Sequence, residues 1–382
     1  MHEFKNPSPH PVRLSEPKLG ALGQERVFKD SHFLNDLGCL KSFQPVVLGM
    51  PGSDNALYVK ANTGQASFRA LFDCGAQCLS ALPVSEVSKV DVICFSHLHF
   101  DHIAGFDHFL RLNFDRANLP VHIFGPPRTA EILHHRLQGV LWDRVDGSLG
   151  NFFISELAHG VVSTYQFKSS DGFKTRALVD TRKFDGRIAQ TKELFIDAVQ
   201  LDHGSPSMGY SIGTAETQVV DSGKLRELGL KGGPWLQKVK DVSVDNSEVV
   251  LVGDAPRAVG ELRAVLLSKK PGERIGYLTD FRHSPQGHAE IAKVFHRADF
   301  IVCENNYGDA DAQLAEKNFH MTSSHVASLA EAIDPRNLIL FHLSDRYTPA
   351  EWVDQLERVR QKFPRAYLPS EWKETLQRSF YE

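Results

Sequence analysis

The stretch FSHLHFDHIAG, residues 95–105, crowds four metal-type side chains into six residues: His97, His99, Asp101 and His102. It follows the apolar run VDVIC and precedes IAGFDHFLRLNF, in which apolar residues recur at helical spacing. The cluster is therefore predicted on the loop between a buried strand and a helix. Because side chains two residues apart at a strand end project to the same side, the His-x-His pair can share one metal ion.

Asp101 and His102 fall at the start of the predicted helix, where they can face a second metal ion. Imidazole and carboxylate groups suit Zn²⁺, and Mn²⁺ and Fe²⁺ accept the same ligands. The alternatives are a chance grouping of surface histidines and a single structural ion. A structural zinc site more often recruits cysteines and closes its coordination shell, so the pattern favours a functional metal site.

Further ligand types follow predicted strands downstream. His203 comes after LFIDAVQL, Asp280 ends RIGYLTD, and His342 follows NLILF. Each residue alone is more often an ordinary turn residue, but all three occur in the same context, at a strand end. We therefore expect them to complete the metal site that residues 97–102 begin.

The composition is that of an ordinary globular protein, with 382 residues, 42% hydrophobic and 24% charged. No apolar run is long enough to span a membrane and no signal segment is evident, so we expect a cytoplasmic protein without a membrane partner. The five cysteines predict reduced, mostly buried thiols. A net charge of −4 gives no global basic field, so a nucleic acid would need a local patch.

The chain divides into an irregular N-terminal extension, residues 1–44, and a folded domain, residues 45–382. The first half of the domain is rich in short β-branched and aromatic runs, and the second half pairs strands with helices. The last helix opens at Thr348 with Pro349 at its first position and Glu351 completing a capping box. This pattern predicts an α/β protein with two sheets flanked by helices, an αββα sandwich.

The chain resembles the metallo-β-lactamase fold hydrolases and, more narrowly, the ribonuclease Z family, whose members trim the 3′ end of precursor transfer RNA. The resemblance covers roughly residues 45–365. It rests on VLGMPGSDNA, LFDCG, SHLHFDHIAG, FGPP, LDHGSPSMGY, LGLKGGPWLQKVK, LTD, CENNY, NFHMTSSH and LFHLSDRY. The His-x-His-x-Asp-His motif is specific for the fold, whereas LDHGSPSMGY and the Gly-Pro segment after it indicate this branch.

The resemblance implies a binuclear zinc centre. One ion would be held by His97, His99 and His203. The other would be held by Asp101, His102 and His342, with Asp280 bridging the two. Two cations about 3.5–4 Å apart lower the pKa of a shared water, and the hydroxide so formed would attack phosphorus.

The resemblance also implies catalytic groups beyond the metals. His320 would protonate the departing ribose oxygen and Glu304 would orient it, so the predicted catalytic residues are Asp101, Glu304 and His320. Asp73 would fix a ligand imidazole. The chain departs from the family pattern at residues 76–79, Ala-Gln-Cys-Leu, where a Glu-Gly-Thr-Gln type run is usual. It departs again at residues 279–281, Thr-Asp-Phe in place of Gly-Asp-Thr, so the walls near the substrate differ while the ligands are kept.

Residues 219–245 interrupt the strand pattern and are expected to form an inserted, protruding arm. The resemblance implies that this arm grips transfer RNA, because lysines contact phosphates without reading sequence and an aromatic ring can pack on a nucleotide. A solvated helical hairpin with no binding role is the alternative. The predicted RNA-binding residues are Lys224, Arg226, Lys231, Trp235, Lys238 and Lys240.

The leading hypothesis is therefore a metal-dependent phosphodiesterase, an endoribonuclease that cleaves the 3′ trailer of precursor transfer RNA. A small-molecule phosphodiesterase that opens cyclic nucleotides is a second hypothesis, because the same site would serve without the arm. A non-catalytic binding protein of this fold is a third, but the complete ligand set argues against it. A second copy of the chain, in a homodimer, is an open partner.

Overall fold

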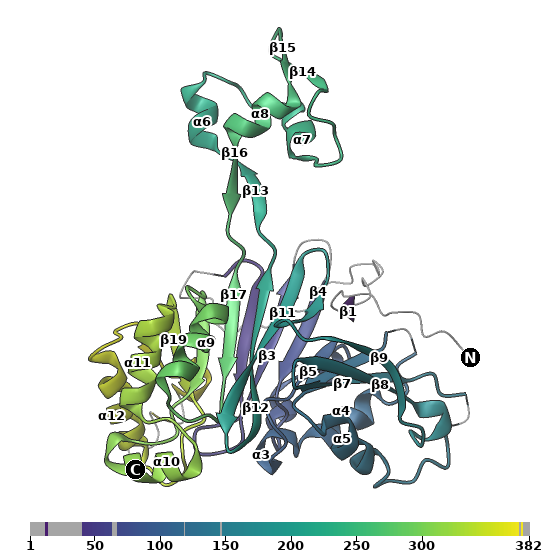
Figure 1. Ribbon diagram of the computed structural model, residues 1–382, viewed down its shortest axis with the longest axis vertical. Helices are drawn as coiled ribbons and strands as arrows, with labels where there is room; N and C mark the ends of the chain where they lie inside the picture. Colours follow the sequence, from purple (N-terminus) through teal and green to yellow (C-terminus); the bar gives the residue numbers. More distant parts are fainter. Residues whose placement is uncertain are drawn as a thin grey trace. The chain divides into compact units, whose positions relative to one another are not determined.

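The computed structural model of the chain describes residues 12–13, 40–62, 67–117, 119–145, 147–373 and 376. It divides into two compact units (Figure 1), of which the first comprises Met1–Gly213 with Glu273–Glu382 and the second comprises Thr214–Gly272. Of the predicted extension, residues 12–13 form a short strand and residues 40–44 lead into the first sheet; the remainder lies outside the described residues. Within the described part of the chain, no helix is both long and apolar enough to cross a membrane.

The first unit contains two mixed sheets, each with eight strands among the described residues. The first sheet runs in chain order: β2 (Phe43–Leu48), β3 (Ala56–Asn62), β4 (Ser67–Phe72), β5 (Val92–Cys94), β6 (Val121–Gly125), β7 (Asn151–Ala158), β8 (Val161–Lys168) and β9 (Ala177–Lys183). The second sheet has the spatial order β1 (Val12–Arg13), β10 (Arg187–Gln190), β11 (Leu194–His203), β12 (Ser205–Thr214), β17 (Arg274–Leu278), β18 (Phe300–Glu304), β19 (Asn337–Phe341) and β20 (Ala366–Tyr367).

Helices cover the outer face of each sheet (Figure 1). The helices that follow the strands of the first sheet are α2 (Val84–Val87), α3 (Phe100–Ile103), α4 (Phe106–Asn113) and α5 (Thr129–Leu137). Those of the second sheet are α9 (Pro285–Phe295), α10 (Ala312–Asn318), α11 (Ser323–Ile333) and α12 (Pro349–Arg360). Four 3₁₀ turns join these elements: η1 (Cys78–Ala81), η2 (Ser169–Asp171), η3 (Asp309–Asp311) and η4 (Ser370–Trp372).

Alternation along the strands produces the layers. In β5, Val92 and Cys94 lie in the core between the two sheets, whereas Ile93 lies in the core under the helices. The period of two residues in a strand places neighbouring side chains on opposite faces, and both faces here are buried, so the strand is apolar throughout. A third core packs β18 and β19 against α9, α11 and α12. The αββα sandwich predicted from the sequence is confirmed.

Parallel pairing matters most for the site. Strands β4, β5 and β6 run parallel in the first sheet, and β17, β18 and β19 run parallel in the second. The carboxyl ends of parallel strands lie at one edge of a sheet, where ligands of α/β proteins commonly bind. Both edges carry the candidate residues, since Asp73 follows β4, His97 follows β5 and Asp280 follows β17.

The second unit has its own small core. Strands β13 (Thr217–Val220) and β16 (Leu267–Lys270) pair antiparallel and connect it to the rest of the chain. Between them lie α6 (Ser222–Glu227), α7 (Trp235–Lys240), the hairpin of β14 (Val249–Val252) and β15 (Ala255–Ala258), and α8 (Val259–Leu266). The predicted arm, residues 219–245, falls inside this unit. The whole of this unit, Thr214–Gly272, is called the arm.

The thiols and one charged cluster complete the core. Cys74, Cys78, Cys94 and Cys303 are free and buried, and Cys39 lies outside the described residues.

Glu86 is 4% exposed, and its carboxylate accepts from Tyr58 at 2.6 Å and from Arg69 Nε at 2.8 Å, with Lys60 Nζ at 3.3 Å. Burial opposes ionisation of Glu86, but the hydrogen bonds from Arg69 and Tyr58 lower its pKa to about 2.

We expect Glu86→Gln to lower the free energy of unfolding by about 3 kcal/mol at pH 7, because it leaves the buried Arg69 guanidinium without its counter-charge. Since the folded-state pKa of Glu86 lies below its unfolded value of 4.5, the stabilisation is present above that pH and fades as the pH falls towards 2. Urea unfolding at pH 7, 5 and 4 should show the difference from the unmodified protein shrinking. Glu131→Gln, which removes one side of a surface ion pair with Arg128, is the control and should change little; a pH-independent gap would contradict the prediction.

Candidate metal centre

The predicted ligands converge from both sheets. His97, His99 and His203 form one group, in which one ring nitrogen of each residue lies within 4.8 Å of those of the other two. The ring centroids of His97 and His99 are 4.4 Å apart, and those of His97 and His203 are 4.9 Å apart. His97 and His99 come from the loop after β5, and His203 ends β11, so this group joins the first sheet to the second.

A second group lies beside the first and consists of Asp101, His102, Asp280 and His342. His102 Nε2 lies 3.0 Å from Asp101 Oδ2 and 2.8 Å from Asp280 Oδ2. His342 Nδ1 lies 3.2 Å from Asp280 Oδ1. Asp280 also lies 3.2 Å from His97 Nε2 through Oδ2, so its carboxylate contacts both groups.

Hydrogen bonds on the far ring nitrogens orient two of the imidazoles. His102 Nδ1 donates to Asp73 Oδ2 at 2.7 Å, and His203 Nδ1 donates to the Phe319 carbonyl at 3.0 Å. Because a carboxylate or carbonyl oxygen only accepts, each Nδ1 carries a proton and each Nε2 faces the site. Asp73 is itself held by Ser96, whose backbone N–H and hydroxyl both donate at 2.6 Å, and by the Tyr277 hydroxyl at 2.9 Å.

Three residues of this site have left-handed backbone conformations. Asp73 has φ 60°, Asp280 has φ 51° and His342 has φ 53°. Residues other than glycine rarely adopt this region, and it costs of order 1 kcal/mol or more each. All three lie where a parallel strand ends, so the chain turns sharply there and aims the side chain along the sheet edge.

Burial and neighbouring charges set the protonation of the histidines. Burial lowers the pKa of His97 to about 2 and lowers that of His99, so both rings are neutral at pH 7. For His102 burial acts in the same direction, but the carboxylates of Asp280, Asp73 and Asp101 outweigh it and raise its pKa well above the ordinary value. A proton and a metal ion compete for the same nitrogen, so these carboxylates favour a cation at this position.

The residues fit a metal ion. The Nε2 atoms of His97 and His102 are buried without a well-directed hydrogen bond, although each lies near the Asp280 carboxylate. Leaving buried polar nitrogens unpaired is costly, and a coordination bond removes that cost. The donor atoms are imidazole nitrogens and carboxylate oxygens without a thiolate, a set that suits Zn²⁺, Mn²⁺ or Fe²⁺.

Glu304 and His320 form a pair at the edge of the centre. Glu304 is fully buried, and its Oε1 accepts from the Phe281 N–H at 2.7 Å while its Oε2 lies 2.8 Å from His320 Nδ1. His320 Nδ1 also lies 3.6 Å from Asp280 Oδ1. Burial opposes protonation of His320, but the Glu304 and Asp280 carboxylates raise its pKa to about 9. The ring is therefore a cation at neutral pH with Nε2 left to donate.

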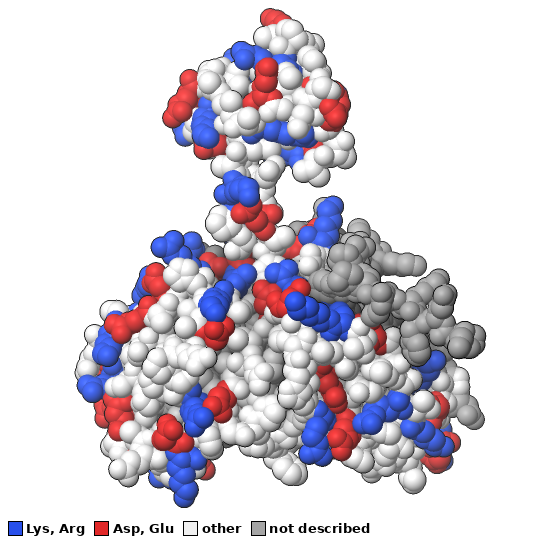
Figure 2. All heavy atoms as spheres, in the orientation of Figure 1, with Lys and Arg blue, Asp and Glu red and all other residues white. Residues whose placement is uncertain are grey.

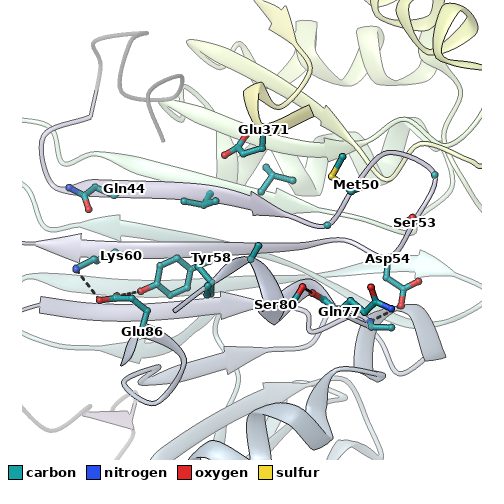
Figure 3. Close-up of a pocket in the computed structure, with 17 residues that line it drawn as sticks. Gln44, Met50, Ser53, Asp54, Tyr58, Lys60, Gln77, Ser80, Glu86 and Glu371 are labelled. Atoms are coloured by element: carbon teal, nitrogen blue, oxygen red, sulfur yellow. Dashed lines mark hydrogen bonds and ion pairs between the residues drawn. The ribbon is translucent and has the colours of Figure 1, made fainter. Parts of the chain in front are cut away.

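A cavity of about 830 Å³ lies along the strands β2 and β3, and none of the candidate ligands lines it (Figure 3). Asp54 lines it, and Asp54 Oδ2 accepts from the Ala76 N–H at 2.7 Å. A Cβ added to Gly75 would lie 2.4 Å from the Asp101 carbonyl oxygen, so only glycine allows the two segments to approach. The neighbouring Asn55 accepts from the His342 N–H at 3.2 Å. These contacts connect one end of the cavity to the second ligand group.

The two departures from the family pattern have different surroundings. Ala76 and Gln77 are exposed and line this cavity, whereas Cys78 and Leu79 are buried in the core under the first sheet. Phe281 is 2% exposed and packs in the core of the second sheet. Thr279 is buried as well, so Ala76 and Gln77 are the residues among these departures that line a wall open to a bound molecule.

Sequence patterns did not reveal Ser96, Tyr277, Phe319 or Asn306 as parts of the site. Asn306 Nδ2 lies 3.1 Å from His342 Nδ1, and the other three hold Asp73 or His203 as described. Tyr277 lies inside an apolar strand and Phe319 acts through its backbone, so neither carries a signal in the sequence. Ser96 directly precedes His97, and Asn306 lies two residues after Glu304. Nearness in sequence to a candidate residue is therefore the one sign that these two belong to the site.

In the arm, one predicted RNA contact needs correction. Trp235 is 9% exposed and packs with Val239, Val250 and Leu266 in the core of the arm, so its ring is not free to stack on a nucleotide. Its apolar surface is what holds α7 to the β14–β15 hairpin and α8. The predicted basic residues are all exposed, and Lys238 Nζ lies 2.6 Å from Glu248. They are Lys224, Arg226, Lys231, Lys238 and Lys240.

Comparisons with known proteins agree with this site. Residues 68–223 match the family model described as a beta-lactamase superfamily domain. The metallo-beta-lactamase fold protein YhfI from Bacillus subtilis is 13% identical, with a TM-score of 0.51, over 86% of this chain and 96% of its own. A long form RNase Z from yeast is 15% identical, with a TM-score of 0.50, over 81% of this chain and 38% of its own. These two likenesses show the fold.

Sequence similarity is closer among curated relatives. Ribonuclease Z of Deinococcus radiodurans is 38% identical over 320 residues, which cover 84% of this chain and 96% of that protein. Ribonuclease Z of Enterococcus faecalis is 28% identical over 304 residues, which cover 77% of this chain and 82% of that protein. The similarity thus extends through both sheets and nearly the whole length of the first relative. The chain belongs to the ribonuclease Z family of hydrolases with the metallo-β-lactamase fold.

Proposed function

We propose that the chain is a metal-dependent endoribonuclease that removes the 3′ trailer of precursor transfer RNA. The observation that carries the proposal is the Glu304–His320 pair, placed 3.6 Å from the Asp280 carboxylate at the edge of the candidate metal centre. A ribose hydroxyl is a poor leaving group and needs a proton as it departs, and a positioned imidazolium supplies one. The relatives named ribonuclease Z support the choice of RNA as the substrate.

We further propose that the centre holds two Zn²⁺ ions. One would be bound by His97, His99 and His203. The other would be bound by Asp101, His102 and His342, with Asp280 between them. Divalent ions bound there would lower the pKa of water and withdraw charge from a phosphoryl oxygen.

The chain's own groups complete the chemistry. Asp73 keeps the His102 ring in one tautomer, and the Phe319 carbonyl does the same for His203. Glu304 accepts from His320 Nδ1, which leaves the proton on Nε2 for the departing oxygen. Both Glu304 oxygens are occupied, by His320 and by the Phe281 N–H, so the carboxylate is held in a single orientation.

The arm supplies a second surface on the same substrate. It carries nine lysines and arginines and eight aspartates and glutamates, so its net charge is only +1 (Figure 2). Its segment 222–240 is different, with five basic residues and one acidic residue, Glu227. We propose that this segment contacts phosphates of the transfer RNA.

The unmodified protein should contain two divalent ions per chain, measured by inductively coupled plasma mass spectrometry. His203→Ala and His342→Ala should each lose about one ion, because each removes a ligand from one group, and Asp280→Ala should lose both. His108→Ala, at an exposed histidine of α4, is the matched control and should keep both. Fully active protein with one ion or none would refute the two-ion proposal.

His320→Ala should slow the cleavage of precursor transfer RNA by about 10²- to 10⁴-fold, the usual contribution of a general acid. Hydrolysis of bis-p-nitrophenyl phosphate should fall far less, because p-nitrophenolate departs without a proton. Metal content is measured alongside, to show that the centre is intact. An equal loss on the two substrates would assign His320 to binding or structure.

Removing the arm should separate RNA cleavage from small-substrate hydrolysis. Val220 faces Leu267 in the β13–β16 ladder, so Asn-Gly in place of residues 221–266 closes the hairpin with a two-residue turn. We expect kcat/KM for precursor transfer RNA to fall at least 100-fold while bis-p-nitrophenyl phosphate, too small to need a second surface, is hydrolysed as before. Unchanged RNA cleavage, or a preference of the unmodified protein for cyclic nucleotides, would favour the small-molecule hypothesis.

A charge variant tests the same surface without deletion. Neutralising Lys231 and Lys240 to Gln should reduce the slope of log binding constant against log salt by roughly one unit for each phosphate that the protein no longer neutralises. Arg257→Gln is the matched control, because it removes an exposed charge from the β14–β15 hairpin, outside the 222–240 segment. Equal slopes for the double variant and the unmodified protein would show that these two lysines do not bind phosphates.

A further inference from the structure

Phe100 is an exposed aromatic side chain in the middle of the metal-binding motif. Its exposed fraction is 83%, and it is the first residue of α3. Among the exposed large apolar side chains of the described residues, it is the one aromatic. The neighbouring helix α4 shows what this fold does with such rings elsewhere, since Phe106 and Phe109 are fully buried.

The position of Phe100 is fixed by its neighbours. His99 and Asp101 belong to the two ligand groups, and the Cα atoms of consecutive residues are about 3.8 Å apart. The centre is open to solvent on this side, because His99 is exposed and the Asp101 side chain is 42% exposed. A molecule that brings a phosphodiester to these ligands therefore comes close to residue 100, whose side chain is open to solvent.

Neither packing nor solubility accounts for this residue. The ring buries little surface, so it contributes little to the hydrophobic core, and a polar residue at the same place would keep the exposed loop soluble. Single exposed apolar residues are common on proteins and need no explanation of their own. What sets Phe100 apart is that both residues next to it are candidate ligands.

We propose that Phe100 is a nucleobase-binding residue, which stacks on the base of a nucleotide that flanks the scissile phosphodiester. This inference rests on the proposed endoribonuclease function and names a substrate contact within it. Unpaired bases of RNA are commonly recognised by stacking on aromatic side chains, and stacking tolerates any base because every base has a flat face. The contact would orient the flanking nucleotide and so align its phosphate with the centre.

The test combines substitutions with abasic RNA. Phe100→Ala should lower kcat/KM for precursor transfer RNA by about 10- to 100-fold, the usual effect of removing one stacked base, and Phe100→Trp should retain activity. An abasic nucleotide on one side of the scissile bond should remove the difference between Phe100→Ala and the unmodified protein; the two RNAs, abasic before or after the bond, identify which base stacks. A penalty that persists with both abasic RNAs would overturn the inference.

The control variant is Leu141→Ala, which removes an apolar side chain that is 90% exposed and lies in another loop, and it should leave cleavage unchanged. Metal content and thermal unfolding should be the same for the Phe100 and Leu141 variants. A separate readout uses 2-aminopurine at the identified nucleotide of an RNA with a non-hydrolysable scissile linkage. Binding to the metal-loaded protein should quench its fluorescence, and Phe100→Ala should abolish the quenching; equal quenching by the two proteins would overturn the inference.

The two proposals fail in different ways. If the unmodified protein does not cleave precursor transfer RNA, the proposed function is wrong. If it cleaves the RNA and Phe100→Ala behaves like Leu141→Ala, the function stands and the role of Phe100 is wrong.

Discussion

The carboxylate of Asp280 is the constraint on which the site depends. It is 2% exposed, and it lies within 3.2 Å of nitrogen atoms from His97, His102 and His342. An isolated carboxylate at such a depth would cost several kcal/mol, so it must be matched by positive charge. Burial opposes its ionisation, yet His342 and His102 hold the pKa of Asp280 well below its ordinary range. Because two of the three neighbouring histidines come from the first sheet and one from the second, the same interaction joins the two halves of the sandwich.

The hydrogen bonds behind the ligands connect the sheets a second time. Asp73 ends a strand of the first sheet, and it accepts from Tyr277, which belongs to the second sheet, and from His102. The left-handed backbone at Asp73 is tolerated because these bonds determine where its carboxylate must lie. Loss of the Tyr277 hydroxyl would therefore loosen Asp73 and, through it, the His102 ring, although Tyr277 itself donates to Asp73 and not to a candidate ligand.

Much of this could be predicted from the sequence, because strand ends are visible as the point where an apolar run stops. The predicted αββα sandwich depends only on such runs, and the candidate ligands follow them directly. The supporting residues could not be found in this way, since Tyr277 is part of an apolar strand and Phe319 acts through its carbonyl. The nucleotide contact predicted for Trp235 fails for another reason. Trp235 lies among lysines in the sequence, but the short helix α7 places its ring in the core of the arm. A local pattern shows which residues are near one another along the chain and not which face of a short helix is buried.

The charge of the arm limits how it can bind RNA. With a net charge of +1, the arm cannot attract a polyanion through a strong general field, and basic and acidic side chains are mixed on the face that Figure 2 shows. On the proposed function, affinity for RNA would come from the segment 222–240, which has five basic residues and one acidic residue, although Lys238 Nζ lies 2.6 Å from Glu248. A folded RNA of defined shape holds its phosphates at fixed spacing, whereas a flexible single strand loses more conformational entropy in matching these few charges. An arm of this kind would bind unstructured RNA weakly and favour a substrate with a rigid, duplex-like surface, so selection among RNAs would begin before any phosphodiester reaches the centre.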